Sequence, residues 1–244
     1  MSRIVVISGG GTGIGLAVAE AFVRDGDQAV LIGRRKDVLD AAVERLGPAA
    51  TAVVADLADE REAARVRDLL AERYGRVDVL VNNAGGNVAL GEGAVGLTTA
   101  ELWTGNFRAN VLTAVLLTEA LRELLADNGR VLLLSSIAAV RGGGSGSYGA
   151  AKAALHPYAY DLAAALGSRG ITVNVIAPGY IADTEFFGEG LSEERRRFLV
   201  GQTLNGRVGV PEDVASLAHW LASPGGAHVT GQILQVNGGA ERGR

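Results

Sequence analysis

Short apolar runs of the kind that form fully buried strands alternate with helical segments along the whole chain. The first run, residues 4–8 (IVVIS), is continuous and β-branched and lacks the polar alternation of a half-exposed strand. Similar runs return at 29–33, 51–55, 77–81, 131–134, 171–176 and 233–236. Helical spacing predicts helices over 13–25, 36–46, 59–74, 99–126 and 211–222, and one more ending near residue 168. This alternation predicts an α/β fold with a parallel sheet covered by helices on both faces.

The composition narrows the classes of protein and of site. No linker or shift in composition divides the 244 residues, so we predict one domain over 1–244. The net charge of -4 without a basic block argues against nucleic acid as a partner. The absence of cysteine and the spacing of the three histidines argue against a metal site. With no charged and apolar leader and no run of about 18 apolar residues, we expect no membrane partner and a cytoplasmic location.

A glycine-rich turn follows the first apolar run directly. Residues 8–15 read SGGGTGIG and open a predicted helix, with Gly9, Gly13 and Gly15 in a GxxxGxG spacing rather than GxGxxG. Glycines let the backbone approach a pyrophosphate, and the helix N-terminus offers free N–H groups and a positive dipole end. Close packing of helix on strand is the alternative. The position of the turn favours a dinucleotide site.

The residues that end the second apolar run indicate which dinucleotide the chain would bind. Residues 33–36 read GRRK, so there is no acidic residue to hold the ribose 2′-hydroxyl of NAD. Arg34 and Arg35 suit a 2′-phosphate, because guanidinium groups bind phosphate in a bidentate way. A solvated basic turn is the alternative. We therefore predict that NADP(H) is preferred and that NAD(H) remains a possible cofactor.

Polar groups also follow the third and fourth runs. Asp56 stands after the third strand, where its carboxylate can accept from an adenine amino group, and Leu57 offers a backbone N–H. Residues 83–85 (NAG) end the fourth strand. The carboxyl ends of parallel strands share one edge of the sheet, so we expect these groups beside the glycine turn.

A tyrosine and a lysine lie four residues apart on a predicted helix. Tyr148 and Lys152 therefore share one helix face, and an ammonium near a phenol lowers the phenol pKa from about 10. Such a phenol can act as a general acid and base. Ser135 and Ser136 end the preceding strand, and only one of them can face the substrate because neighbouring residues on a strand point to opposite sides.

In this order the motifs resemble those of the short-chain dehydrogenase/reductase family, of the single-domain type that includes 3-oxoacyl-acyl-carrier-protein reductases. The resemblance extends over essentially the whole chain. It is carried by Gly9-x-x-x-Gly13-Ile14-Gly15, Asp56, Asn82-Asn83-Ala84-Gly85, Asn110, Tyr148-x-x-x-Lys152, Asn174-x-x-x-Pro178-Gly179, Gly231-Gln232 and Asn237-Gly238-Gly239. It implies a Rossmann-like, doubly wound sheet of seven parallel strands in the order 3-2-1-4-5-6-7. It also implies hydride exchange between a nicotinamide cofactor and a carbonyl or alcohol substrate, and a homotetramer or homodimer.

The resemblance also implies roles for individual residues. Tyr148 would be the acid/base, Lys152 would lower its pKa and hold the nicotinamide ribose, and Asn110 would support a water relay. Ser136 is favoured over Ser135 as the serine that holds the substrate oxygen. The implied cofactor-binding residues are Gly9, Gly11, Thr12, Gly13, Ile14, Gly15, Arg34, Arg35, Asp56, Leu57, Asn83, Ala84, Gly85, Tyr148, Lys152, Pro178, Gly179, Ile181 and Thr184.

Two positions depart from the family pattern, and three segments are expected to form the substrate pocket. The family's threonine after Pro178-Gly179 would fall at position 183, which is Asp183 here, and Thr184 comes one residue later. Thr12 stands where NADP-preferring relatives often have a basic residue. The variable segments are 86–98, 137–147 and 181–205, the last predicted to form a lid whose charged run, 193–197, is solvated. Such relatives reduce 3-oxoacyl thioesters, steroids, sugars or small ketones. A catalytically silent dinucleotide-binding regulator or scaffold on the same fold is the alternative.

Overall fold

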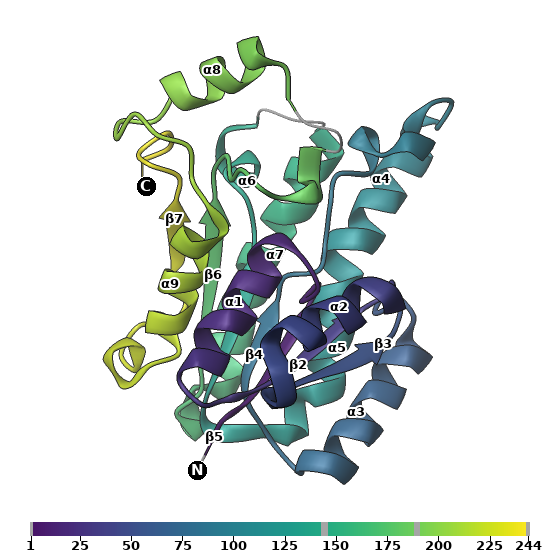
Figure 1. Cartoon of the computed structure of the whole chain (residues 1–244), viewed down its shortest axis with the longest axis vertical. Helices are drawn as coiled ribbons and strands as arrows, with labels where there is room; N and C mark the ends of the chain where they lie inside the picture. Colours follow the sequence, from purple (N-terminus) through teal and green to yellow (C-terminus); the bar gives the residue numbers. More distant parts are fainter. Residues whose placement is uncertain (1, 143–145, 188–190, 243–244) are drawn as a thin grey trace.

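Seven parallel strands form one sheet in the order β3-β2-β1-β4-β5-β6-β7, which confirms the predicted topology (Figure 1). The computed structural model describes residues 2–142, 146–187 and 191–242. The strands are β1 (Ile4–Ser8), β2 (Gln28–Gly33), β3 (Ala50–Val54), β4 (Val77–Asn82), β5 (Leu125–Leu134), β6 (Thr172–Pro178) and β7 (Ile233–Val236). The strand order reverses between β1 and β4. Open α/β sheets bind ligands beyond the carboxyl ends of the strands at such a point.

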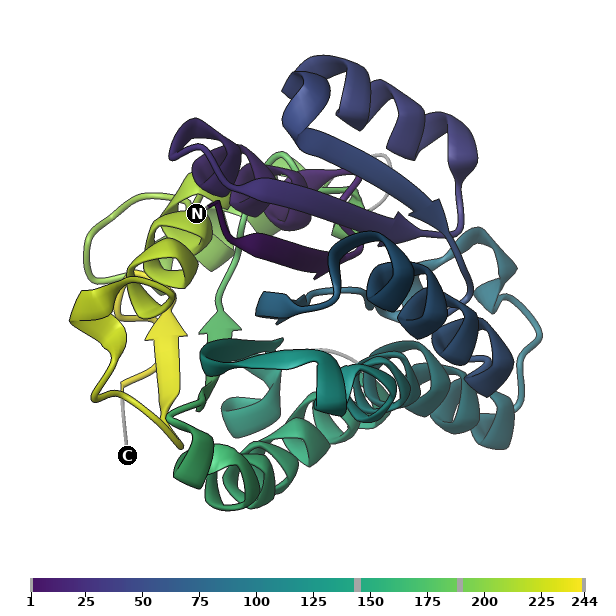
Figure 2. The ribbon, with the colours of Figure 1, turned by 90° about the horizontal axis from the view of Figure 1, so that it is seen from below.

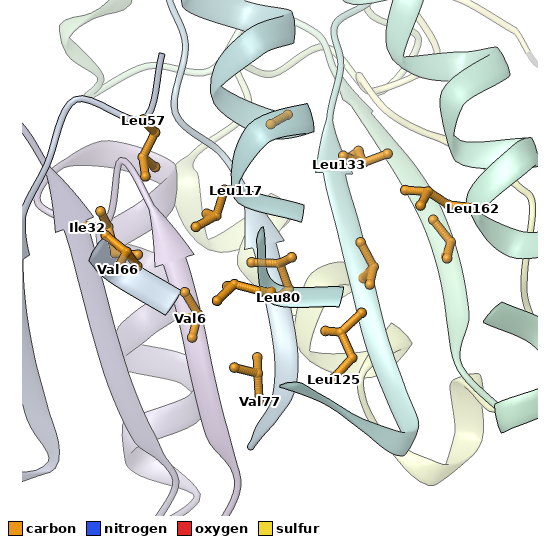
Figure 3. Packing of buried hydrophobic residues seen from close by; sticks show 14 of the residues in the cluster. Val6, Ile32, Leu57, Val66, Val77, Leu80, Leu117, Leu125, Leu133 and Leu162 are labelled. Carbon is orange, nitrogen blue, oxygen red and sulfur yellow. The ribbon is translucent and has the colours of Figure 1, made fainter. Parts of the chain in front are cut away.

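Helices cover both faces of the sheet, as Figure 2 shows. They are α1 (Gly13–Arg24), α2 (Lys36–Leu46), α3 (Glu60–Tyr74), α4 (Thr99–Phe107), α5 (Thr113–Leu121), α6 (Ala138–Arg141), α7 (Gly146–Leu166), α8 (Glu193–Gly201) and α9 (Pro211–Leu221). On one face, Val66 of α3, Leu117 of α5 and Leu162 of α7 belong to a buried cluster with the strand residues Leu80 and Leu133 (Figure 3). A second buried cluster joins α1, α2 and α9 to the other face. Burial on both faces explains why the strands read as continuous apolar runs.

The helix expected over 99–126 is interrupted in its middle. A π-helical turn, Arg108–Leu112, separates α4 from α5. The side-chain amide of Asn110 donates to the carbonyl oxygen of Asn106 at 2.9 Å, and so takes the acceptor that an α-helical backbone N–H would use. π-helical turns of this kind are frequent at functional sites.

The same helix also ends earlier than predicted. α5 stops at Leu121, a short 3₁₀ turn follows, and Leu125 already belongs to β5, where it pairs with Val77 of β4. Leu124 and Leu125 continue the helical spacing in the sequence, but Leu125 is 1 % exposed because it packs against the sheet. Tertiary pairing therefore overrides the local helical pattern.

The lid segment, residues 181–205, lies near the carboxyl ends of the last strands. It contains the 3₁₀ turn Glu185–Phe187 and helix α8, which Figure 1 shows beyond the ends of β6 and β7. Residues 188–190 lie outside the described residues. The charged run 193–197 is exposed, as predicted.

Three aromatic side chains are about half exposed on helices α4 and α7: Trp103 and Phe107 on α4 and Tyr160 on α7. The pairing of long helices between copies of the chain, which the family resemblance implies, stays a prediction. Within the described ranges, no helix combines the length and apolar character needed to cross a bilayer.

Candidate active site

Hydrogen bonds tie the ends of β1 and β4 together at the carboxyl edge of the sheet. The hydroxyl oxygen of Ser8 accepts from the backbone N–H groups of Asn83 (3.0 Å) and Ala84 (2.9 Å). The side-chain amide of Asn83 donates to the carbonyl oxygens of Ser8 (3.1 Å) and Gly9 (3.0 Å). The glycine turn and the segment after β4 therefore form one continuous wall at the strand-order switch.

Glycines of the turn stand where a side chain would be strained or would clash. Gly9 and Gly13 have φ of +63° and +51°, and a Cβ on Gly15 would stand 2.1 Å from the carbonyl oxygen of Gly9. α1 begins at Gly13, and its N-cap residue Thr12 donates its hydroxyl to Glu185 (3.3 Å) instead of capping the helix. A bare backbone at the N-terminus of a helix fits the pyrophosphate of a dinucleotide.

Two exposed arginines follow β2. The guanidinium of Arg35 donates to both carboxylate oxygens of Glu185, at 2.6 and 3.1 Å. Arg34 makes no hydrogen bond or ion pair with any residue that the structure describes. The two guanidinium groups are therefore in different states, one paired with the lid and one open to solvent.

Asp56 lies after β3 on the same side of the site. Its carboxylate accepts from the backbone N–H of Ala58 (3.1 Å) and from Arg108 (3.0 Å). Burial by itself raises the pKa of Asp56, but these two hydrogen bonds, together with the positive charges of Arg108 and Arg34, outweigh it and hold the pKa below its usual value. The side chain of Leu57 is buried in the core (Figure 3). Its predicted contact with a cofactor would therefore be made by its backbone N–H.

The two candidate serines point to opposite sides. The hydroxyl of Ser136 is hydrogen-bonded to the phenol of Tyr148, whose side chain is buried at the start of α7. The hydroxyl of Ser135 donates to the backbone carbonyl of Lys152 (3.1 Å) and lies 2.8 Å from Nε2 of His156. Of the two, Ser136 therefore shares the space beside the Tyr148 hydroxyl.

Burial dominates the acidity of the tyrosine and lysine. It raises the pKa of Tyr148 to about 12, and the hydrogen bond from Ser136 offsets only part of this. It lowers the pKa of Lys152 to about 8. The ammonium of Lys152 donates to the carbonyl of Leu134 (2.7 Å) and lies 6.0 Å from the centre of the Tyr148 ring. The expected lowering of the Tyr148 pKa by Lys152 is thus wrong for the chain by itself, because the lysine points to β5.

Asn110 and Lys152 converge on the segment after β4. The side chain of Asn110 exchanges hydrogen bonds with the backbone of Gly86, accepting from its N–H (3.1 Å) and donating to its carbonyl (2.8 Å). A Cβ on Gly85 would stand 2.5 Å from Oδ1 of Asn110 and 3.0 Å from Nζ of Lys152. The π-helical turn therefore places Asn110 against the loop that the resemblance assigns to the cofactor.

Asn106 is a site residue that the sequence analysis missed. It is fully buried, its amide donates to the hydroxyl of Ser147 (2.9 Å), and its Oδ1 accepts from the N–H of Val88 (3.1 Å). It thereby joins the residue before Tyr148 to the loop after β4. The spacing Asn-x-x-x-Asn, with Asn110 one turn later, was the available signal.

The segment after β6 reaches the glycine turn. Pro178 ends β6, and Gly179 donates its N–H to the β7 backbone at 2.9 Å. Ile181 is buried beyond it. The methyl carbon of Thr184 lies 3.2 Å from the position that a Cβ on Gly13 would take. Predicted site residues follow six strands, β1 to β6, and Thr184 brings the segment after β6 against the turn that follows β1.

A cavity of about 670 Å³ adjoins Ser136 and Tyr148. All three segments predicted to form the substrate pocket contribute to it, although residues 143–145 lie outside the described residues. Among the described residues, Arg141 and Arg195 are the charged ones in its lining, and Arg141 donates to the carbonyl of Ala240 (2.6 Å). Most of the wall is apolar, supplied mainly by Leu90, Ile137, Phe186, Leu191, Phe198 and Leu199.

Comparison with known proteins identifies the family. The sequence model described as enoyl-(acyl carrier protein) reductase matches residues 9–241. A crystal structure of a short-chain dehydrogenase/reductase from Brucella melitensis superposes with a TM-score of 0.90 at 31% identity, over 99% of this chain and 97% of that chain. The chain belongs to the short-chain dehydrogenase/reductase family.

Two further similar proteins are a reductase and a protein that binds NADPH. The 3-oxoacyl-[acyl-carrier-protein] reductase FabG of Escherichia coli is 31% identical over 240 residues, covering 97% of this chain and 96% of that protein. A blue fluorescent protein from a metagenomic library, solved in complex with NADPH, has a TM-score of 0.88 at 33% identity, with 98% of each chain covered. The chain is accordingly an oxidoreductase that acts on CH–OH and C=O groups with NAD(P)(H).

Proposed function

We propose that the chain is an NADPH-dependent reductase that converts a ketone to a secondary alcohol, with Tyr148 as the proton donor. The observation that carries this proposal is the buried phenol of Tyr148, hydrogen-bonded to Ser136 at the wall of an apolar cavity. A pKa of about 12 keeps this phenol protonated near neutral pH. A protonated phenol is the form that a reduction requires.

The proposed steps follow from the positions of these side chains. NADPH supplies the hydride when it is bound. Ser136 and Tyr148 hold the substrate carbonyl oxygen by hydrogen bonds, and Tyr148 donates its proton to that oxygen as the alcohol forms. Lys152, buried beside Gly85, would contact the nicotinamide ribose and stabilise the phenolate left behind. A positioned acid of this kind contributes roughly 10²–10⁴-fold to the rate.

The proposed preference for NADPH rests on the end of β2. Arg34 and Arg35 stand there without an acidic neighbour in residues 33–36, and two guanidinium groups suit a 2′-phosphate. The NADPH complex of the metagenomic relative supports this choice. NAD(H) would bind the same turn without using the arginines.

The cavity favours a substrate with an apolar body. Its wall is mostly aliphatic and aromatic, and the guanidinium of Arg141 is already engaged by the Ala240 carbonyl. Arg195 stacks on Phe198 with its guanidinium carbon 5.0 Å from the ring centre. A 3-oxoacyl thioester has such an apolar chain, and the name of the Escherichia coli relative supports this substrate class.

Replacing Tyr148 by phenylalanine tests the function. We expect Tyr148→Phe to keep NADPH binding, measured by cofactor fluorescence, while the rate of ketone reduction falls roughly 10²–10⁴-fold. Ser136→Ala should lose more turnover than Ser135→Ala, a matched pair whose hydroxyls point to opposite sides. Near wild-type turnover in Tyr148→Phe would refute the assignment. NADPH binding without turnover on a broad panel of ketones and 3-oxoacyl thioesters would favour a silent regulator.

A further inference from the structure

The carboxylate of Glu185, in the lid segment, accepts hydrogen bonds from groups that could also bind a phosphate. Both oxygens of Glu185 accept from the guanidinium of Arg35, at 2.6 and 3.1 Å. One of them also accepts from the hydroxyl of Thr12 (3.3 Å), the N-cap residue of α1. A bidentate anion on an arginine beside a helix N-terminus is also the way in which proteins bind phosphate.

The contact is between charged groups that solvent can reach. The hydrogen bond from Arg35 lowers the pKa of Glu185, so the side chain is a carboxylate at neutral pH. Each side chain of the pair remains 56% exposed. Solvent screens such a pair, so a more highly charged anion can displace Glu185 from Arg35.

The position of Glu185 couples this contact to the proposed catalytic residue. The next residue, Phe186, packs its ring on Tyr148 with the ring centres 5.3 Å apart. The 3₁₀ turn Glu185–Phe187 therefore touches both the basic end of the site and the phenol. Residues about 150 positions apart in the sequence meet here.

We propose that Glu185 is a specificity-determining residue that reduces the preference for NADP(H) over NAD(H) by competing with the 2′-phosphate for Arg35. This inference rests on the dinucleotide site of the proposed function. NAD(H) has no 2′-phosphate and so has no need of Arg35, whereas NADP(H) must displace the carboxylate to use it. Arg34, which forms no hydrogen bond or ion pair within the described ranges, accepts the phosphate without this competition.

The test is the ratio of two dissociation constants in Glu185→Gln. Kd values for NADPH and NADH are measured by cofactor fluorescence at fixed ionic strength. Loss of one exposed pair should tighten NADPH about 2- to 5-fold relative to NADH. Glu194→Gln is the matched control, because it removes the same charge from exposed residues of the lid and makes no ion pair with Arg35.

A double variant assigns the effect to the arginine. In an Arg35→Ala background, Glu185→Gln should leave the ratio of the two Kd values unchanged. The inference would be overturned if Glu185→Gln left the ratio of the two Kd values unchanged, or if it tightened the binding of both dinucleotides equally. If Arg35→Ala still weakens NADPH binding, the proposed function would stand. Failure of the wild-type chain to bind either dinucleotide would instead overturn the proposed function itself.

Discussion

An alanine at position 15 is expected to disturb both stability and cofactor binding. Its Cβ would lie 2.1 Å from the carbonyl oxygen of Gly9 and 2.7 Å from Nδ2 of Asn83. Carbon atoms in good contact stand about 3.5 Å from their neighbours, so relief of the 2.1 Å contact requires α1 and the glycine turn to separate by about 1.4 Å. The nearest atom belongs to the backbone, which cannot move aside as a flexible side chain can.

The expected cost follows from this clash. Overpacking of a well-packed region costs about 1–3 kcal/mol. For a chain of this size each kcal/mol lowers Tm by about 2–4 °C, which gives a fall of about 2–12 °C. Alanine favours a helix over glycine by up to about 1 kcal/mol, which offsets the lower end of that range. Because the displaced backbone forms the proposed pyrophosphate site, NADPH affinity should fall as well.

Thermal unfolding with and without NADPH measures both effects. Gly167→Ala is the control, because Gly167 is exposed, has no positive φ, and an added Cβ there meets nothing within 4 Å. Gly15→Ala should therefore melt lower than Gly167→Ala and gain less Tm from NADPH. Wild-type Tm together with wild-type NADPH affinity in Gly15→Ala would refute the reasoning.

Two further predictions concern buried polar side chains. Asn106→Leu removes the side chain that the Val88 N–H and the Ser147 hydroxyl contact. We expect the free energy of unfolding, measured by chemical denaturation, to fall by about 1–3 kcal/mol, and kcat to fall as well. Wild-type values of both quantities would contradict the positioning role. Burial lowers the pKa of Lys152 from 10.5 to about 8. Between pH 8 and pH 10.5, Lys152 therefore holds a proton in the unfolded chain that it lacks in the folded chain. Over this pH range the free energy of unfolding should rise by about 3 kcal/mol. Lys152→Met should lack this rise, and identical pH profiles for the two proteins would contradict it.

Much of the fold and of the site's location could be predicted because the signals are local. The continuous apolar runs and the glycine turn express the requirements of buried strands and of a close backbone approach within a few residues. Residues 83–85 and Asn110 were likewise expected in the site, and the structure brings them together beside Lys152. The π-helical turn was not foreseen, because it depends on a side-chain hydrogen bond that competes with the backbone.

The sequence by itself determined the alternation of strands and helices, the glycine turn, and which residue types stand at each strand end. Tertiary structure alone decided three properties of the site. It turned Ser136 rather than Ser135 toward Tyr148, it raised the pKa of Tyr148 by burial, and it placed Glu185 on Arg35. The physical reason is shared: side-chain direction, burial and ion pairing depend on neighbours that are distant in the chain, whereas propensity and spacing act within a few residues.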